Sequence, residues 1–462
     1  MKNVVALSLL LLVLATPEVR AEEGRSAAKA EDDDAKATDA VTDQWPQFRG
    51  PEGRGIASGT VPMHWSTSEK VLWRTEIAGR GHSSPVVWND LVFLTTAVEG
   101  DVVPGAKAPT HFRKGHEDWV HPDSVGADRR HRLEVIAIDT RSGAVRWKQI
   151  AYEGLVYDAR HREGSYASPT CATDGETLIA YFGSEGVFAY DFEGRLLWTR
   201  DVGDIKSFGM SVGTSPILLG NLVILQADAE DGTDSYLIAL DKKNGDEVWK
   251  TSRRPVQMSW TTPFVAAAPD GTTQILANGF EMVAAYDPAS GRELWHASGM
   301  DSNAVQMPLA ENGLAIFSAG HPRKFTMAVK LGASGDLTGS SNIAWTYPKG
   351  TGYIPTNLLY EGRLYITNDS GTLTCLDPTT GAVIYEGGRV EAPGTVMASL
   401  LAVDGKILMV NRDGDATLVR AGPVHQVLAT SSIDEPVYAT PAIANGRIYL
   451  RGERHLYAIG TN

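Results

Sequence analysis

The segment Thr214–Trp249, TSPILLGNLVILQADAEDGTDSYLIALDKKNGDEVW, contains the repeating unit of this chain. It opens with a small residue before a proline. Three short apolar runs follow, separated by a Gly-Asn turn and an acidic loop, and a tight turn between Asp241 and Gly245 leads to a fourth run. Short runs of β-branched, aliphatic and aromatic residues between turn residues are typical of β-strands. The segment therefore predicts one four-stranded antiparallel meander.

The same unit recurs along most of the chain. The small-residue-Pro opener returns at intervals of 45 to 47 residues in the middle of the sequence. A period of roughly 40–50 residues with four strands per unit is typical of a β-propeller. We therefore expect an all-β fold, an eight-bladed propeller of four-stranded antiparallel blades. The blades are expected to begin near Pro85, Pro169, Pro216, Pro263, Pro308, Pro355, Ser399 and Pro441.

Aromatic residues recur at the position that closes each unit, after the pattern Asp-x-x-x-Gly. Regular spacing of this kind favours packing between blades over stacking on a cofactor. The expected blade-closing residues are Trp73, Trp147, Trp198, Trp249, Trp295, Trp345 and Tyr385.

The two ends of the chain complement each other. Residues 71–77 resemble a fourth strand without the first three, whereas residues 441–460 supply three strands without a fourth. Pairing of the two would close the ring and hide its sheet edges. Residues 45–70 are rich in Gly and Pro but carry three large aromatic residues, so we expect an ordered coil packed on the ring, without regular structure of its own.

The N-terminal region resembles an export signal. Residues 1–21 combine an early lysine, a short apolar stretch and a small-x-Ala cleavage site, which is typical of a secretory signal peptide. Residues 22–44 are acidic and poor in large apolar residues, so a disordered leader is expected. Residues 45–462 form the single propeller domain, with an insertion at 99–132 in the first blade.

Location and partners follow from these features. The mature chain is expected to be exported to the periplasm or another extracytoplasmic compartment, soluble and monomeric, without a transmembrane span. It is not expected to be a lipoprotein, because no cysteine lies near the cleavage site. The net charge of −14 argues against a nucleic-acid binder. Cys171 and Cys375 fall in the second and sixth blades, so both are expected to be free thiols.

The blade pattern resembles that of the PQQ-like (pyrroloquinoline-quinone-type) propellers. The phrases WPQFRGPEGRG (45–55), RGHSSPVVWNDLVFLTTA (80–97) and HREGSYASPT (161–170) resemble exported PQQ-like repeat proteins similar to the outer-membrane barrel-assembly scaffold BamB. The resemblance covers residues 45–462 and implies the eight-bladed fold. Quinoprotein dehydrogenases of this family hold PQQ under a pair of adjacent cysteines and beside a calcium ion bound by Glu, Asn and Asp. This chain has no adjacent cysteines.

Function is expected on the face that carries the blade-to-blade loops and the insertion, because insertions in repeat proteins often collect on the binding face. Aromatic and polar residues of these loops suit a ligand or peptide at the channel mouth, although packing around the axis explains them equally well. The candidates are His82, His161, Glu163, Tyr166, Trp260, Asn303, Gln306, Tyr353 and Tyr438.

Catalytic and metal-binding residues are less well defined. No catalytic residue is assigned. His116 and His121 in the insertion are weak metal candidates, with a solvated loop as the alternative. The acidic loop 228–234 lacks the spacing of a calcium loop and is interpreted as an ordinary turn. We therefore expect a scaffold or binding propeller for an envelope protein or a small ligand, without a confidently assigned cofactor. The alternative is a quinoprotein, PQQ-dependent alcohol dehydrogenase-like oxidoreductase with calcium and a degenerate site.

Overall fold

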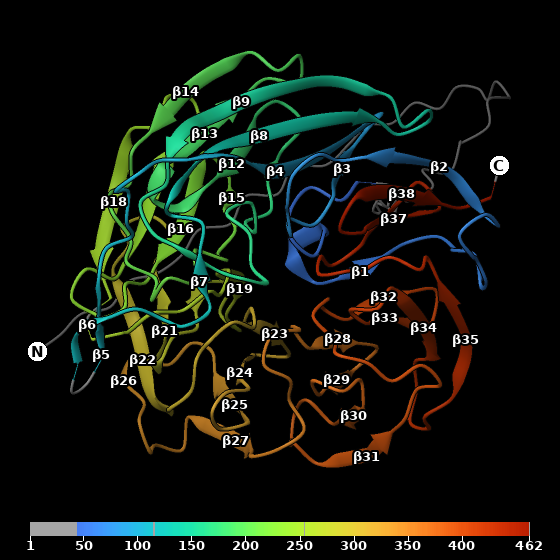
Figure 1. Ribbon diagram of the computed structural model, residues 1–462. Coiled ribbons are helices and arrows are strands. Elements are labelled where there is room, and N and C mark those ends of the chain that lie inside the picture. The colour runs from blue at the N-terminus through green and yellow to red at the C-terminus, as the bar shows by residue number, and fades with distance from the viewer. Residues whose placement is uncertain (1–43, 114–115, 254, 462) are drawn as a thin grey trace, which may run out of the picture. The chain divides into compact units, whose positions relative to one another are not determined.

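The computed structural model describes residues 44–461 except 114–115 and 254, and gives no side-chain detail for 112–117. The expected signal peptide and nearly all of the expected leader lie outside the described residues. The part of the chain that is described is all-β, with eight four-stranded antiparallel blades in a ring (Figure 1). The expected fold class is therefore confirmed. No helix within these residues has the length and hydrophobicity to cross a membrane.

Seven blades are continuous in sequence, and β26 (Gly335–Asp336) adds a short parallel strand to the outer edge of the fourth. In chain order they are β3 (Val86–Trp88), β4 (Leu91–Val102), β8 (Arg129–Asp139) and β9 (Val145–Leu155); β11 (Ala172–Thr173), β12 (Leu178–Tyr181), β13 (Val187–Tyr190) and β14 (Leu196–Arg200); β15 (Ile217–Leu219), β16 (Leu222–Ala227), β17 (Tyr236–Asp241) and β18 (Glu247–Ser252); β19 (Phe264–Ala267), β20 (Thr273–Ala277), β21 (Glu281–Tyr286) and β22 (Glu293–Met300); β23 (Leu309–Glu311), β24 (Leu314–Ala319), β25 (Phe325–Lys330) and β27 (Ile343–Tyr347); β28 (Leu358–Tyr360), β29 (Arg363–Thr367), β30 (Leu373–Leu376) and β31 (Val383–Gly388); and β32 (Leu401–Val403), β33 (Lys406–Val410), β34 (Asp415–Arg420) and β35 (Val427–Ser432).

The eighth blade joins the two ends of the chain. It consists of β36 (Ala442–Ala444), β37 (Arg447–Arg451), β38 (His455–Ile459) and, as its outer strand, β2 (Val71–Glu76). β2 pairs antiparallel with β38, so that Val71 lies opposite Ile459. The ring closure expected from the sequence is therefore present.

The turn glycine and the closing tryptophan of the repeat meet across the boundary between two blades. Trp73 Nε1 donates a hydrogen bond to the carbonyl oxygen of Thr140 in the first blade at 2.9 Å. Gly143, in the same turn, has φ of +72°, and an added Cβ would lie 2.7 Å from the Trp73 ring. Glycine therefore serves both the left-handed turn and the close approach of the indole. Trp147, Trp198, Trp249 and Trp345 donate in the same way to Phe192, Lys242, Pro288 and Pro378.

The hydroxyl groups of the blade openers link neighbouring blades near the axis. In each link a backbone N–H donates to the Ser or Thr hydroxyl of the next opener, at 2.9 to 3.1 Å. Met307 has no hydroxyl, and there Thr261 Oγ1 donates to the carbonyl of Gln306 instead. These bonds explain why small hydroxyl residues recur at the openers. The six links run from Ser84 to Thr170, Thr170 to Ser215, Ser215 to Thr262, Met307 to Thr356, Thr356 to Ser399, and Ser399 to Thr440.

Residues 45–57, which we call the channel segment, lie along the inner strands of the ring. Both ends of the segment lie beside turns between first and second strands, because Trp45 pairs with Val87 and Ala57 pairs with Val403. It contains the short 3-10 helix η1 (Pro51–Gly53) and β1 (Ile56–Ala57), so the expectation of no regular structure is wrong at these two places. β1 pairs parallel with β32, because the blade-7 inner strand offers a free edge toward the axis (Figure 1). Arg49 is fully buried and donates to five backbone carbonyls, including those of Leu400 and Asn357.

Both cysteines are free and buried, as expected. Burial raises the pKa of Cys171 to about 12 and that of Cys375 to about 11. Neither thiol is therefore poised as a nucleophile.

Candidate functional site at the loop face

The blade-to-blade loops and the loops between second and third strands lie on one face, which we call the loop face. Arg412, between β33 and β34, forms a 3.2 Å ion pair with Glu163 in the loop between the first two blades. Asp369, between β29 and β30, accepts a hydrogen bond from the backbone N–H of Tyr353. The two kinds of loop therefore form one surface.

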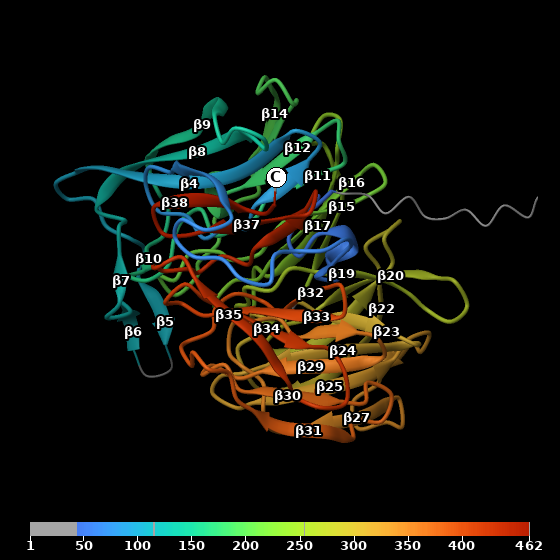
Figure 2. The same cartoon turned by 90° about the vertical axis from the view of Figure 1, so that its right-hand side faces the viewer.

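The insertion of the first blade lies over this face. It forms the hairpin β5 (His111–Arg113) and β6 (His116–Trp119), followed by β7 (Ser124–Val125), which pairs with β10 (Arg160–His161). Figures 1 and 2 show these strands in front of the ring, on the side of the second to fourth blades.

A buried ion cluster fixes this hairpin to the ring. His111 lies between two carboxylates, with Nδ1 2.7 Å from Glu230 Oε2 and Nε2 3.2 Å from Asp158 Oδ1. All three side chains are at most 6% exposed. Burial alone would lower the pKa of His111, but the bonds to Asp158 and Glu230 outweigh it and raise that pKa to about 9. His111 is therefore a cation at neutral pH.

Replacement of His111 by Gln is expected to destabilise the protein in a pH-dependent manner. Folding raises the pKa of His111 from 6.5 to about 9. Its charge therefore contributes fully to the free energy of unfolding below pH 6.5, and this contribution is lost as the pH rises through 9. The shift corresponds to a contribution on the order of 3 kcal/mol. The difference in unfolding free energy between wild type and His111→Gln, measured from pH 6 to 10, should shrink with rising pH.

His64→Gln serves as the control, because His64 is exposed. A wild-type–His111→Gln difference that stays constant over this pH range would contradict the assignment of charge to His111.

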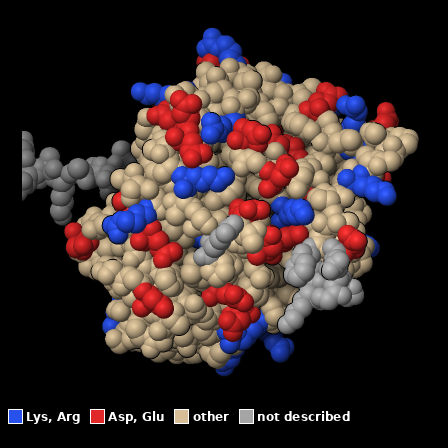
Figure 3. Space-filling model, turned by 90° about the vertical axis from the view of Figure 1, so that its left-hand side faces the viewer, with Lys and Arg blue, Asp and Glu red and all other residues tan. Residues whose placement is uncertain are grey.

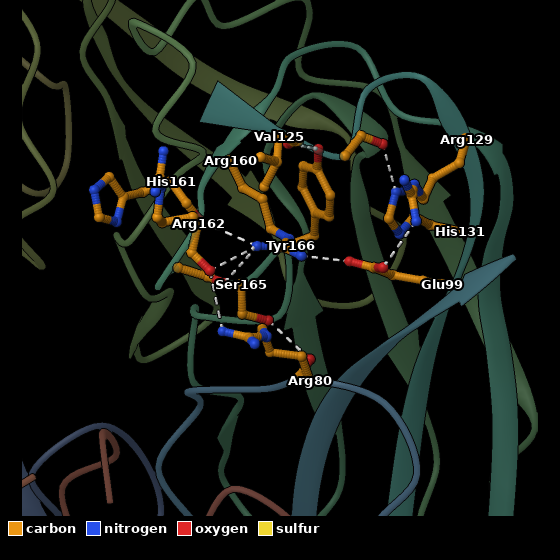
Figure 4. Close-up of polar contacts among 12 residues, drawn as sticks. Arg80, Glu99, Val125, Arg129, His131, Arg160, His161, Arg162, Ser165 and Tyr166 are labelled. Atoms are coloured by element: carbon orange, nitrogen blue, oxygen red, sulfur yellow. Dashed lines mark hydrogen bonds and ion pairs between the residues drawn. The ribbon is translucent and has the colours of Figure 1, made fainter. Parts of the chain in front are cut away.

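Beneath the insertion, a second polar cluster surrounds Tyr166 (Figure 4). Arg160 pairs with Glu99 and donates to three nearby carbonyls, while Arg129 pairs with Glu99 at 3.3 Å. The Tyr166 hydroxyl donates to the carbonyl of Val125 at 3.3 Å, and its ring lies 4.7 Å from that of His131. Burial raises the pKa of Tyr166. Tyr166 is thus placed in the packing under the insertion.

At the channel mouth, the His82 ring stacks on Tyr438 at 4.5 Å with an interplanar angle of 9°. Burial and the neighbouring arginines Arg451, Arg80 and Arg160 lower the pKa of His82 to about 3, so its imidazole is neutral. Arg451 is 3% exposed, and among the residues that the structure describes it donates hydrogen bonds only to Ser83. No carboxylate within the described residues pairs with it. This corner of the mouth therefore holds the buried cation Arg451. Beside it, Glu453 pairs with Arg80 and Glu163 pairs with Arg412.

A second group of candidates lies on the opposite side of the mouth. Asn303 Nδ2 donates to the Tyr353 hydroxyl at 3.3 Å, and the His321 ring lies 5.2 Å from the Tyr353 ring. Trp260 Nε1 donates to the carbonyl of Ser211 at 2.8 Å. Gln306 is fully buried and donates to Thr351 and Gly352, which places it in the packing below the surface.

The remaining candidates lie in the insertion and beside it. His161 is 3.7 Å from Asp123, and its ring lies 6.2 Å from that of His121. The side chain of His116 is outside the described set. Among the described residues, no three His, Cys, Asp or Glu side chains converge as ligands for a metal ion.

Sequence reasoning missed the residues that organise this face. Residues 230–234 form turns and bends, as interpreted, but Asp228 and Glu230 are buried and ion-paired, which the interpretation missed. His111 and Glu230 are 119 residues apart, so spacing gave no signal of their contact. The position of Asp228 directly after the apolar strand β16 nevertheless suggested that this acid is buried.

Comparison with known proteins identifies the family and the fold of this chain. The family described as outer membrane protein assembly factor BamB matches residues 131–386. Similar solved structures include BamB from Moraxella catarrhalis, with 12% identity, a TM-score of 0.55, and coverage of 84% of this chain and 98% of that one. Quinohemoprotein alcohol dehydrogenase from Comamonas testosteroni has 11% identity, a TM-score of 0.62, and coverage of 92% and 81%. A europium-containing methanol dehydrogenase has 11% identity, a TM-score of 0.61, and coverage of 90% and 89%. The comparison with curated proteins found no match.

At these identities the solved structures demonstrate the shared propeller fold alone. The family match spans more than half of the sequence. This chain belongs to the family of outer membrane protein assembly factor BamB.

Proposed function

We propose that this protein is an extracytoplasmic binding propeller that holds a partner protein of the cell envelope at its loop face. The observation that supports this proposal most strongly is the fixation of the insertion by the buried cluster of His111, Asp158 and Glu230. A buried ion pair that links loops distant in sequence gives a rigid platform, and pre-organised surfaces bind at a lower entropic cost.

The half-buried aromatic groups of this platform suit an interface. Tyr438 and Tyr353 lie on either side of the mouth, each against a histidine ring. Tyrosine and tryptophan are enriched among the residues that dominate binding energy at interfaces. By contrast, acidic and basic side chains lie interspersed on the side of the molecule that Figure 3 shows.

Quinone-dependent relatives of this family hold PQQ together with calcium. The lid of adjacent cysteines cannot form, because Cys171 and Cys375 lie in different blades. Where side chains are described, no set of three acidic, histidine or cysteine ligands converges on one point. Without the cysteine lid, these residues do not reproduce the quinone site of those relatives, and we derive no step through PQQ.

Alanine variants of the mouth aromatics are expected to weaken partner binding. Cross-linking in envelope extract followed by mass spectrometry would identify the partner, and biolayer interferometry with that purified partner would measure affinity. We expect Tyr353→Ala and Trp260→Ala each to raise Kd about 30-fold, since such anchors contribute about 2 kcal/mol. Lys243→Ala, in an exposed turn on the opposite face, should leave Kd unchanged.

Two results would overturn this proposal. One is loss of binding on changing the opposite turns alone. The other is tight, stoichiometric binding of PQQ with calcium together with dye-linked alcohol oxidation, which would support the quinoprotein alternative.

A further inference from the structure

The outer edge of the fourth blade carries an added strand that comes from the fifth blade. β26 runs parallel to β22, with Gly335 opposite Trp295 and Asp336 opposite His296. The N–H of Leu337 then donates a hydrogen bond to the carbonyl of His296 at 2.8 Å. The backbone of an outer strand therefore accepts an extended segment at the residue after the closing tryptophan, as sheet edges do when they bind peptides.

Two side chains of this added segment contact the blade edge. The Asp336 carboxylate lies 3.6 Å from His296 Nε2, so an acid faces a basic group. Leu337 is 2% exposed and belongs to the core cluster that contains Trp295, and Leu294 packs against the same cluster. An acid followed by a large apolar residue therefore fits an edge on which an apolar and a basic side chain flank the tryptophan.

The outer strand of the third blade, β18, repeats the edge of β22. Both strands lie on the outer rim, in neighbouring blades (Figure 1). Trp249 lies opposite Ala239 of β17, as Trp295 lies opposite Ala285 of β21, and the register shifts at the same place in both pairs. The sequences are Glu-Val-Trp-Lys at 247–250 and Glu-Leu-Trp-His at 293–296. The two strands therefore correspond residue by residue around the tryptophan.

The edge of β18 differs from that of β22 because no strand covers it among the described residues. Val248, at the position of Leu294, is 49% exposed. Lys250, at the position of His296, lies 3.7 Å from the centre of the Tyr236 ring, and no carboxylate of the described residues pairs with it. β18 thus combines an uncovered edge, an exposed apolar side chain and a cation without a carboxylate partner.

Only one other uncovered outer strand of the described blades has an apolar residue before the closing residue and a cation after it. This strand is β2, in which Leu72 and Arg74 flank Trp73. Leu72 is partly buried and packs against the core of the eighth blade, whereas Val248 protrudes. β2 therefore serves as the matched control for β18.

We propose that the outer edge of β18 binds an extended segment of a partner protein as a parallel fifth strand. An acidic residue of this segment faces Lys250, and the apolar residue after it packs against Val248 and Trp249. The main chain supplies pairing that depends little on sequence, and alternate side chains supply the selection. The Gly-Asp-Leu sequence at 335–337 of the chain itself defines the partner chemistry. The edge lies on the rim, so this inference is independent of the partner binding proposed at the loop face.

The test uses a fluorescein-labelled peptide with the sequence of residues 332–341, GASGDLTGSS, as the probe. Fluorescence anisotropy should show one saturable site per chain. Hydrogen exchange followed by mass spectrometry should show slower exchange of residues 247–252 when the probe is bound, because the added strand covers N–H groups of the edge. Lys250→Glu and Val248→Asp should each weaken the probe about fivefold, since an exposed contact contributes up to about 1 kcal/mol. Arg74→Glu should leave the affinity unchanged.

A charge exchange separates the proposed contact from a general effect of the variants. A probe carrying Asp336→Lys should bind the wild type more weakly than the original probe and should bind Lys250→Glu more tightly than the wild type. Absence of saturable binding to the wild type, slower exchange confined to another strand such as β2, or equal affinity of both probes for the wild type and Lys250→Glu would each overturn the proposal. Tyr353→Ala should not affect the probe, so the loop-face proposal and this one stand or fail separately.

Discussion

A chain without residues 44–76 is expected to aggregate, because its ring cannot close. The deletion removes β2, so the whole edge of β38 becomes free to pair with another molecule. It also removes Trp73 from its contacts with Tyr449 and Gly143, and Arg49 from the axis. Since domains of this kind are stable by only about 5–15 kcal/mol, the loss of a strand and two buried anchors exceeds what the ring tolerates.

Size-exclusion chromatography and thermal melting monitored by circular dichroism would measure this effect. The synthetic peptide 44–76, added in trans during refolding, should restore part of the monomer. Trp73→Phe, which keeps β2 but loses the bond to Thr140, should remain monomeric with a lower Tm. A truncated chain that stays monomeric with the Tm of the full protein would contradict the closure.

Replacement of Asp228 by Ala is expected to lower the free energy of unfolding by about 3–5 kcal/mol. Asp228 and Arg253 are fully buried, with Oδ1 and Nε 2.8 Å apart. Arg253 also donates to the Tyr286 hydroxyl and to the carbonyl of Asn278. Asp228 further accepts from Ser259. Removal of the carboxylate leaves a buried guanidinium without its counter-charge, which costs far more than the pair contributes when intact.

Chemical denaturation, followed by tryptophan fluorescence, would measure the loss of unfolding free energy in Asp228→Ala. The paired replacement Asp228→Leu with Arg253→Met should recover most of it, because no unpaired charge remains. Arg195→Ala, which breaks a pair with Asp191 on a side chain that is 76% exposed, should cost less than about 1 kcal/mol. Equal losses of unfolding free energy for Asp228→Ala and Arg195→Ala would contradict the larger cost expected for breaking the buried pair.

The fold was predictable because its rules are local and repeated. The Asp-x-x-x-Gly turn and the tryptophan after it specify the blade edge, and the structure shows the same indole–carbonyl bond at five boundaries. Trp295 donates to Gln274 instead, because the fifth blade has a longer connection between β25 and β27 that contains β26.

The site was less predictable because its contacts join residues that are distant in sequence. His111 meets Glu230 only after the insertion crosses to the third blade, and Arg49 meets Leu400 only after the channel segment packs against the inner strands.

The pairing of β2 with β38 sets the order in which the chain can finish folding. Val71 is synthesised near the beginning of the described region, whereas its partner Ile459 lies at the far end. Contacts between such distant residues slow folding, because the entropy of closing the intervening loop is lost before the contact contributes any free energy. Earlier blades can assemble while the chain grows, but β2 stays unpaired until residues 455–459 appear. Any product that ends before β38 therefore retains two open sheet edges, which favours its aggregation or removal by proteases.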